Sequence, residues 1–379
     1  MNLLSFEYSN EFTSIDKIIF NQMNLLVGAS GSGKTTILKA LQDVIDIGLG
    51  DYETRLSNNF SWTLEFEDGN QSYRWEGKVK TPEQRIIFDD LNNEEIVKIA
   101  FISESMVKDF EYSPKIIFKR ENNSLSYLGK ELPNLAINQT CLEILSEEDE
   151  IIPIVKAFRK VYNFNFDSEA KSNIGKIIDF EALKKETVSD LASLRELNVG
   201  VMLKLAICYE YHKGTFSEIV EIYKSIFHFI EDVRFERRIL PLEDEARVIM
   251  NLQIKELGSE WISKKHISSG MLKTFLYIST LYLMPRDSII LIDEFENSLG
   301  VNCLNIINDD MDILGTLQQV ITSHHPYIIN NVQIENWKIV SRSKDHIYVN
   351  DASNYNIGKS KHEAFYQLIN LPIYKEGRA

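Results

Sequence analysis

The stretch NLLVGASGSGKTTILKALQDV, residues 24–44, constrains the fold of this chain more than any other. A short apolar run enters a glycine-rich turn. Apolar residues then recur at Ile37, Leu38, Leu41 and Val44, which is the spacing of one helix face. We therefore expect a strand, a turn and a helix in direct succession, as in an α/β fold.

The turn itself fits the pattern G-x-x-x-x-G-K-[S/T] at every fixed position. Its glycines allow the backbone to curl so that successive N–H groups face one phosphate group, and the helix that follows adds its positive N-terminal end. Lys34 is expected to reach the β- and γ-phosphates, and Thr35 to hold Mg²⁺ through its hydroxyl. The residues expected to bind nucleotide here are Gly28, Ala29, Ser30, Gly31, Ser32, Gly33, Lys34, Thr35 and Thr36.

Composition excludes several classes of protein. The 379 residues are 44% hydrophobic and 26% charged, which is typical of a globular chain with one large domain and an insertion, or with two domains. The apolar runs are too short to span a bilayer, and the N-terminus has no basic signal-peptide region, so we expect a cytoplasmic protein without membrane association. The net charge of −15 gives no general attraction for nucleic acid, although a local basic stripe can lie on an acidic body.

The pattern of the chain changes twice along its length. Near the N-terminus, alternating apolar residues predict hairpins that turn at Asp68-Gly69 and at Asn122-Asn123. A long middle region has helical periodicity and few breakers, and alternation of strands and helices then returns. The predicted divisions are residues 1–134 (P-loop and antiparallel β lobe), residues 135–255 (a helical insertion) and residues 256–379 (the second half of the nucleotide-binding head).

The segment SIILIDEFENSLG contains a second candidate site. Four apolar residues precede Asp293 and Glu294, so a buried strand is expected to deliver two carboxylates to its C-terminal end. An apolar strand that ends in Asp-Glu is as often structural as functional when it stands alone. Because the same chain carries a P-loop, we expect Asp293 to support the metal and Glu294 to polarise the attacking water.

Two further segments complete a recognisable order of motifs along the chain. HISSGMLKTF places Ser268, Ser269 and Gly270 at an apparent helix start, which alone is an ordinary N-cap, and VITSHHP places His324 after another apolar strand. P-loop, Ser-Ser-Gly, Asp-Glu strand and histidine follow one another as in ABC-type ATPases. The chain resembles one branch of them, the RecF/SMC-like AAA ATPases, which includes OLD-family proteins and the ATPases of the Septu, Gabija and PARIS anti-phage systems.

This resemblance implies an ABC-type head, which is a mixed sheet with helices, an antiparallel β lobe and a helical insertion. It implies ATP and Mg²⁺ as cofactors, hydrolysis of ATP to ADP and phosphate, and a homodimer or higher homo-oligomer closed through ATP between its heads. Glu294 and His324 would be catalytic. The residues that would contact the γ-phosphate held by the other copy are Ser268, Ser269 and Gly270.

The metal set implied by the resemblance is Thr35, Asp293 and Glu104, and it includes one departure from the family. Glu104 lies in the strand KIAFISES, at whose end relatives usually offer a glutamine near the metal. Two other departures are Gly300, where many relatives have a histidine, and His325, which replaces a common serine. None of these changes removes a group on which hydrolysis must depend.

Three functions remain open for such a head. It can be a sensor or scaffold that regulates a separate effector, a nuclease or toxin, in anti-phage defence; a DNA repair or chromosome-maintenance ATPase that clamps DNA; or the nucleotide-binding subunit of an ABC transporter. The transporter is disfavoured because its P-loop and Asp-Glu strand lie much closer in sequence. A DNA clamp needs a basic surface, and the weak basic signal favours the regulatory function. The candidate basic residues are Arg234, Arg237, Arg238, Lys264, Lys265 and His266.

Overall fold

The structure is a computed structural model, and it divides into two compact units. Unit 1 comprises Met1–Asn163, Asp287–Asp293 and Gln318–Ala379, and unit 2 comprises Phe164–Arg286 and Glu294–Leu317. Each unit is described by itself. The described residues are 1–51, 59–80, 87–88, 95–96, 100–122, 124–133, 136–164, 190–241, 246–298, 317–355, 357 and 361–375.

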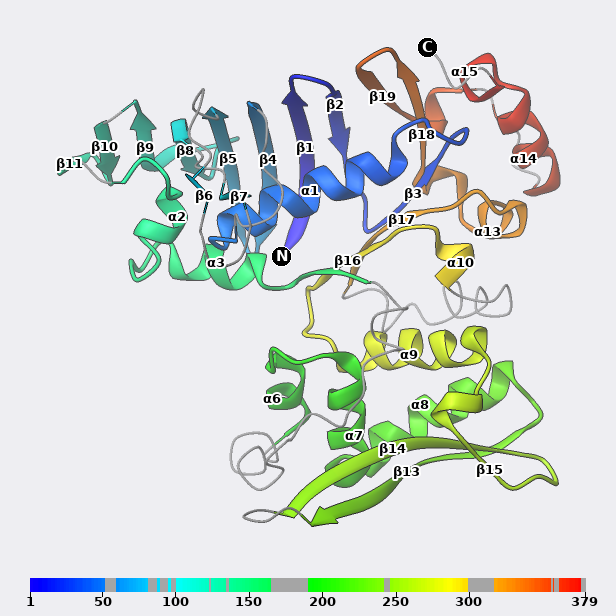
Figure 1. The fold of residues 1–379 in the computed structure, drawn as a ribbon. Helices are drawn as coiled ribbons and strands as arrows, with labels where there is room; N and C mark the ends of the chain where they lie inside the picture. The colour runs from blue at the N-terminus through cyan, green and yellow to red at the C-terminus, as the bar shows by residue number, and fades with distance from the viewer. Residues whose placement is uncertain are drawn as a thin grey trace. The chain divides into compact units, whose positions relative to one another are not determined.

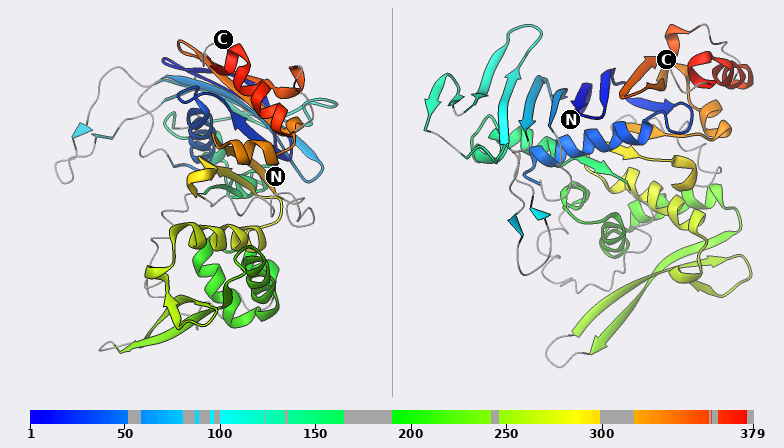
Figure 2. Two further views of the ribbon diagram at one scale, coloured as in Figure 1. Left: turned by 90° about the vertical axis from the view of Figure 1, so that its right-hand side faces the viewer. Right: turned by 45° about the horizontal axis from the view of Figure 1, so that its top comes forward.

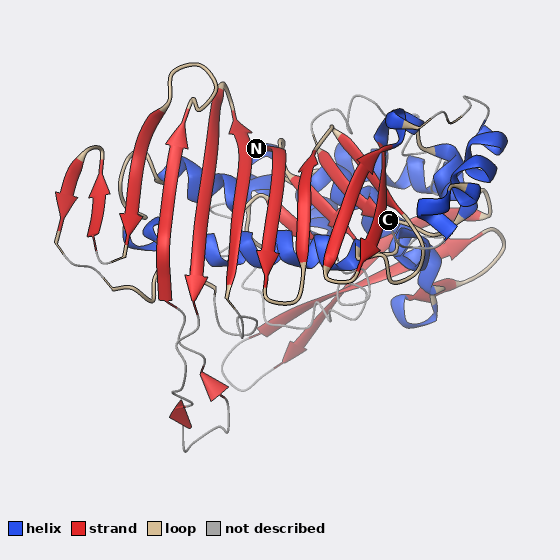
Figure 3. Ribbon diagram, turned by 90° about the horizontal axis from the view of Figure 1, so that it is seen from above, coloured by secondary structure: helices blue, strands red, loops and turns tan. Residues whose placement is uncertain are grey.

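Unit 1 is built on a large twisted sheet, which Figure 3 shows from above. Its described residues form 14 strands in one hydrogen-bonded order. The order is β11 (Lys130–Leu132), β10 (Ser124–Tyr127), β9 (Lys115–Glu121), β8 (Ala100–Lys108), β5 (Gln71–Lys80), β4 (Phe60–Asp68), β1 (Asn2–Asn10), β2 (Ser14–Ile19), β19 (His346–Asp351), β18 (Trp337–Ser343), β3 (Met23–Val27), β17 (Gln318–Thr322), β16 (Ile289–Ile292) and β12 (Val161–Asn163).

The sheet has two halves of different character. From β11 to β2 every pairing is antiparallel, and this half is the predicted β lobe. Both predicted hairpins are confirmed, since β4 pairs with β5 and β9 pairs with β10. The other half contains β18, β3, β17, β16 and β12 in parallel register, with β19 antiparallel to β18. The predicted fold class, a mixed α/β sheet of the P-loop type, is therefore confirmed.

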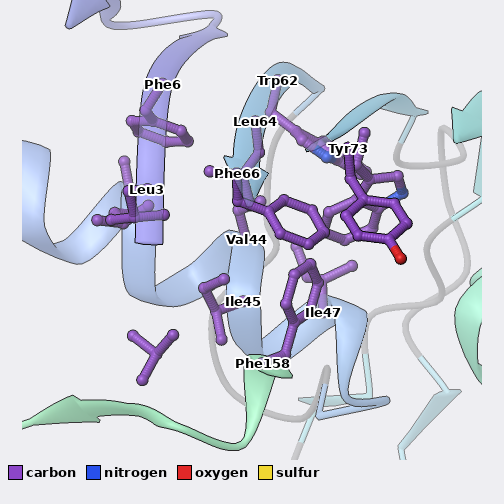
Figure 4. Packing of buried hydrophobic residues seen from close by; sticks show 14 of the residues in the cluster. Leu3, Phe6, Val44, Ile45, Ile47, Trp62, Leu64, Phe66, Tyr73 and Phe158 are labelled. Carbon is purple, nitrogen blue, oxygen red and sulfur yellow. The ribbon is translucent and has the colours of Figure 1, made fainter. Parts of the chain in front are cut away.

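Helix α1 (Lys34–Gly48) lies along one face of this sheet (Figure 1). Its buried side chains recur at helical spacing, as the sequence predicts. Figure 4 shows Val44, Ile45 and Ile47 of α1 packed with aromatic residues of the β lobe. The rings of Phe66 and Phe158 lie 5.2 Å apart, edge to face.

Phe158 ends helix α3 (Ile152–Phe158), which with α2 (Cys141–Ile144) belongs to unit 1. The limits of the compact units therefore differ from the predicted division at residue 135. The helices of unit 1 near the C-terminus are α13 (Pro326–Asn331), α14 (Lys361–Asn370) and α15 (Pro372–Lys375). Among the described helices of the chain, none is both long and apolar enough to cross a membrane.

Unit 2 combines helices with a small antiparallel sheet (Figure 2). Its helices are α6 (Leu191–Glu196), α7 (Val201–Tyr211), α8 (Lys213–Ile226), α9 (Ser269–Leu283) and α10 (Phe295–Ser298), and its strands are β13 (Ile230–Pro241), β14 (Ala246–Glu256) and β15 (Trp261–Ser263).

The prediction of a helical insertion over residues 135–255 is therefore wrong where β13 and β14 lie. The physical reason is visible along β13, where buried and more exposed residues alternate. Val233 and Phe235 are buried, and the residues that follow each of them, Arg234 and Glu236, are not. This alternation has the period of a strand and overrides the helical pattern of the residues before it.

Candidate functional site

Three parallel strands of unit 1 end at the same edge of the sheet and bring the predicted site together. In the register of the sheet, Thr322 at the end of β17 lies opposite Leu26 of β3, and Ile321 lies opposite Ile292 of β16. The P-loop follows β3, Asp293 follows β16 and His324 follows β17. All residues of both strands are buried. Strand β16 is an unbroken apolar run, as expected for a strand covered on both faces, whereas β17 begins with Gln318 and Gln319 and ends in Thr322.

The P-loop has the conformation that its glycines predict. Gly31 and Gly33 have φ angles of 81° and 105°, which disfavour residues with a side chain. A Cβ atom on Gly28 would lie 2.2 Å from the carbonyl oxygen of Val340, and one on Gly33 would lie 2.5 Å from Cδ1 of Ile347. Neighbouring strands β18 and β19 therefore pack directly against the loop and leave no room for side chains there.

Lys34 is buried at the start of α1 and reaches back across the loop. Its Nζ donates to the carbonyl oxygens of Gly28 at 2.9 Å and of Ala29 at 3.0 Å, and lies 3.4 Å from Ser32 Oγ. The ammonium group and the N-terminus of a 15-residue helix thus meet at one loop, an arrangement that favours a polyphosphate. Of the other predicted residues, Ser30 is exposed and Thr36 is half-buried in the first turn of α1.

Asp293 joins three elements through a single carboxylate oxygen. Its Oδ1 accepts a hydrogen bond from Thr35 Oγ1 at 3.1 Å and another from Thr322 Oγ1 at 2.6 Å. Hydroxyl and carboxylate oxygens are the hard donors that Mg²⁺ prefers, and Mg²⁺ usually completes its shell with phosphate and water. No group of three or more His, Cys, Asp or Glu side chains that could hold a metal occurs among the described residues.

Thr322 was not among the residues predicted from sequence. The signal for it was a polar β-branched residue that directly follows the apolar pair Val320 and Ile321, two positions before His324. Its partner Asp293 is distant in sequence, so only the parallel pairing of β16 with β17 reveals the contact.

Glu294 is exposed and is the first residue of the second segment of unit 2, whereas Asp293 is the last residue of its segment of unit 1. Glu294 adopts a φ of 47°, a left-handed conformation that costs a residue with a side chain about 1–2 kcal/mol. The next residue, Phe295, is buried in unit 2, with its ring 5.7 Å from and perpendicular to that of Tyr277 in α9. Strain of this kind is characteristic of functional positions and draws attention to Glu294.

His324 and His325 lie, half-buried, between β17 and α13. The backbone N–H of His325 donates to Ser323 Oγ at 3.0 Å, and Nδ1 of His325 accepts from the N–H of Tyr327 at 3.2 Å. The second contact is an N-cap of α13, a role usually taken by Ser, Thr, Asp or Asn. His325 therefore serves as the N-cap of α13.

In unit 2, Ser268, Ser269 and Gly270 form the start of α9, as predicted. Ser268 is the N-cap, its Oγ accepting from the N–H of Met271 at 3.3 Å. Both serines are exposed, and a Cβ atom on Gly270 would meet no heavy atom within 4 Å. The structure thus leaves the backbone of this helix start accessible.

The C-terminal end of α9 is held by two cations. Arg195 Nε donates to the carbonyl oxygen of Tyr282 at 2.8 Å, and Lys204 Nζ lies 3.3 Å from that of Leu283. Lys204 is buried, and its burial lowers its pKa to about 8. Cations at this end complement the helix dipole, whose positive end is at Ser268.

Glu104 does not stand at a strand end, and this part of the prediction is wrong. Strand β8 continues to Lys108, paired with β5 on one side and β9 on the other, so Glu104 is a central residue of it. Its carboxylate is buried and accepts from Trp75 Nε1 at 3.1 Å and from the N–H of Cys141 at 2.7 Å. Burial raises its pKa, and Arg120 Nη1 lies 4.0 Å away. Gly300 lies outside the described residues.

The parallel strands, the P-loop and the hydrogen-bonded Asp293 define the class of a P-loop NTPase. Residues 23–330 match the family described as "AAA domain, putative AbiEii toxin, Type IV TA system", and the chain belongs to this family. The match confirms the predicted AAA-type class. Among proteins with curated descriptions, none matches the chain.

Similar solved structures include three SMC heads. The SMC head bound to the C-winged helix domain of ScpA has a TM-score of 0.46 and 11% identity, covering 92% of this chain and 97% of that one. The SMC head domain from Thermotoga maritima has a TM-score of 0.44 and 11% identity, covering 93% and 99%. The head with an extended coiled coil bound to the C-terminal domain of ScpA, from Pyrococcus furiosus, has a TM-score of 0.41 and 12% identity, covering 92% and 96%.

Proposed function

We propose that the protein is a Mg²⁺-dependent ATPase whose chemistry is carried by the P-loop and by Asp293 and Glu294. The observation that carries this proposal is the pair of hydrogen bonds from Thr35 and Thr322 to Asp293 Oδ1. P-loop ATPases hold their metal with a P-loop hydroxyl and a strand-end aspartate, and here those two groups are already in contact.

Each residue has a definite task in this reaction. Lys34 exchanges its loop carbonyl acceptors for the β- and γ-phosphate oxygens of ATP, and the loop N–H groups and the α1 N-terminus bind the remaining charge. Bound Mg²⁺ would neutralise the charge that develops on the transferred phosphate. Glu294 orients a water and takes its proton. His324 follows β17 at the same sheet edge as the P-loop and contacts the γ-phosphate.

The complete site includes a second copy of the chain. Ser268, Ser269 and Gly270 form an accessible helix start, and the backbone N–H groups at such a start bind anions. In the proposed dimer this helix start contacts the γ-phosphate of ATP held by the partner's P-loop. ATP then stabilises the closed pair, and hydrolysis releases it, because the nucleotide binds the two states with different free energies.

We further infer that this cycle regulates a separate effector, a nuclease or toxin, in anti-phage defence. The family description, which names a putative toxin and a type IV toxin–antitoxin system, supports a role of this kind. A DNA clamp is less well supported, since part of the basic cluster is already engaged. Arg234 stacks 3.9 Å from the ring centre of Trp261, and Arg238 pairs with Glu236 at 2.9 Å.

The catalytic proposal is tested by ATP binding and phosphate release with purified protein. Lys34→Ala should abolish binding, and Glu294→Gln should retain it while slowing hydrolysis about 100-fold or more. Lys39→Ala is the matched control, because Lys39 is an exposed lysine on the same helix. Unchanged turnover in Glu294→Gln removes Glu294 from its role, and wild-type protein that releases no phosphate with Mg²⁺ refutes the ATPase.

Dimerisation and defence need separate measurements. Sedimentation of Glu294→Gln should show a dimer with ATP and a monomer without it. Ser268→Arg should remain a monomer both with ATP and without it. For defence, plaque counts are compared between cells that express the wild-type chain with its neighbouring gene and cells that carry Lys34→Ala instead. Equal counts argue against the defence role while leaving the ATPase assignment intact.

A further inference from the structure

The hydrogen bond from Thr322 is the shorter of the two that Asp293 Oδ1 accepts from Thr35 and Thr322. Its O···O distance is 2.6 Å, within the range for a hydroxyl that donates to a carboxylate and shorter than the 3.1 Å from Thr35. Thr322 is 1% exposed, whereas Asp293 is half-buried. The donor is thus enclosed in protein, and the acceptor lies at the boundary with the site.

The backbone around Thr322 gives this hydroxyl a fixed direction. Strand β17 is central in the parallel half of the sheet, with β3 on one side and β16 on the other, and Thr322 is in register with Leu26. The next residue, Ser323, is also buried, and its N–H lies 3.4 Å from the carbonyl oxygen of Leu26. A β-branched side chain in a strand has few χ1 choices, so Oγ1 is held toward Asp293.

The two hydroxyl groups that donate to Asp293 Oδ1 are expected to have different roles when a metal is bound. Thr35 is the hydroxyl that a P-loop offers to Mg²⁺, so its oxygen must serve the metal. Thr322 comes from another strand and directs its hydroxyl proton to the carboxylate. Among the described residues, no hydrogen bond is made to Asp293 Oδ2, which leaves that oxygen available for a metal or for a metal-bound water.

We propose that Thr322 is a positioning residue that holds the Asp293 carboxylate in the orientation needed for Mg²⁺ while Thr35 binds the metal. This inference rests on the proposed ATPase function. Strand β17, which leads to His324, then has a second role: it orients Asp293, which follows the neighbouring strand β16. The role is distinct from catalysis, because Thr322 acts through Asp293.

Calorimetric titration with ADP tests this role without requiring turnover, once with Mg²⁺ and once with EDTA. In the wild-type protein, Mg²⁺ should tighten ADP binding. Thr322→Val preserves the side-chain shape and removes the donor, so it should reduce this Mg²⁺-dependent gain about 10-fold or more and change metal-free ADP affinity less than about 2-fold. Thr322→Ser keeps the donor and should retain the gain within about 3-fold.

Each outcome decides between the role and its alternatives. A Thr322→Val protein that keeps the full Mg²⁺-dependent gain overturns the inference, and so does one whose metal-free binding weakens as much as its metal-dependent binding. If Thr322→Val does not fold, Thr322→Ala is titrated in its place against the serine variant. Wild-type protein that shows no gain from Mg²⁺ removes the proposed ATPase itself, a result distinct from failure of Thr322 alone.

Discussion

Replacement of Glu104 by alanine distinguishes a structural carboxylate from a metal ligand. In the structure, Glu104 is 1% exposed in the middle of β8, and its two oxygens accept from Trp75 Nε1 and from the N–H of Cys141. These contacts tie β8 to β5 and to the start of α2. We therefore expect Glu104→Ala to lower the free energy of unfolding and to leave the Mg²⁺ requirement of the ATPase unchanged.

The size of the loss follows from the partners that remain. Leaving a buried N–H without an acceptor costs about 1–3 kcal/mol, and both Trp75 and Cys141 lose theirs. Arg120 still donates to the carbonyl oxygens of Gln139 at 2.7 Å and Ala136 at 3.4 Å, so its guanidinium group retains hydrogen-bond acceptors. Burial raises the pKa of Glu104, because it disfavours the charged form of the carboxyl group. Removing this group therefore recovers part of the free-energy cost of burying it. The expected loss is therefore about 2–4 kcal/mol.

Urea denaturation followed by tryptophan fluorescence measures this loss, because Trp75 is a direct partner of Glu104. Glu76→Ala is the matched control, since Glu76 is exposed on the adjacent strand, and it should change stability by less than about 0.5 kcal/mol. An unchanged unfolding free energy for Glu104→Ala, together with a raised Mg²⁺ requirement, would refute the structural role and restore Glu104 as a metal ligand.

Three further predictions concern both units. The pKa of about 8 for folded Lys204 lies below its unfolded value of about 10.4, so the unfolded state binds more protons between these values. Urea unfolding should therefore show stability rising with pH in that window, and Lys204→Met should remove this slope. Gly28→Ala should abolish the rise in Tm caused by ADP, because its Cβ would clash with the carbonyl of Val340. In the same urea assay, His325→Ala should lower the free energy of unfolding by about 1 kcal/mol through loss of the α13 N-cap, whereas His325→Ser should retain it.

The features that sequence predicted correctly are local ones. The P-loop and α1 depend on glycines, a lysine and a helical apolar stripe within one short segment, and the structure places them as expected. Ser268 caps α9 for the same reason, because an N-cap oxygen and the N–H that donates to it lie only three residues apart. Strand β16 was recognisable because burial on both faces favours an unbroken apolar run, here Ile289–Ile292.

The features that sequence missed depend on partners distant along the chain. The strand that contains Glu104 could be recognised, but its end could not, because the pairing with β5 and β9 decides where β8 stops. The sequence predicts helix where β13 and β14 lie, because the helical apolar spacing of the preceding residues extends close to the start of β13. In the same way, nothing near Thr322 in sequence identifies Asp293 as the acceptor of its hydroxyl.

The arrangement around α9 links the helices of unit 2 to the proposed regulatory role. The helix is buried along nearly its whole length, its C-terminal carbonyls accept from Arg195 and Lys204, and only its N-terminal residues are exposed. Because Lys204 is part of α7, a shift of α7 along its axis changes the contacts at the far end of α9. The N-terminal residues of α9 stay exposed, as the contact with a partner-held phosphate in the proposed dimer requires.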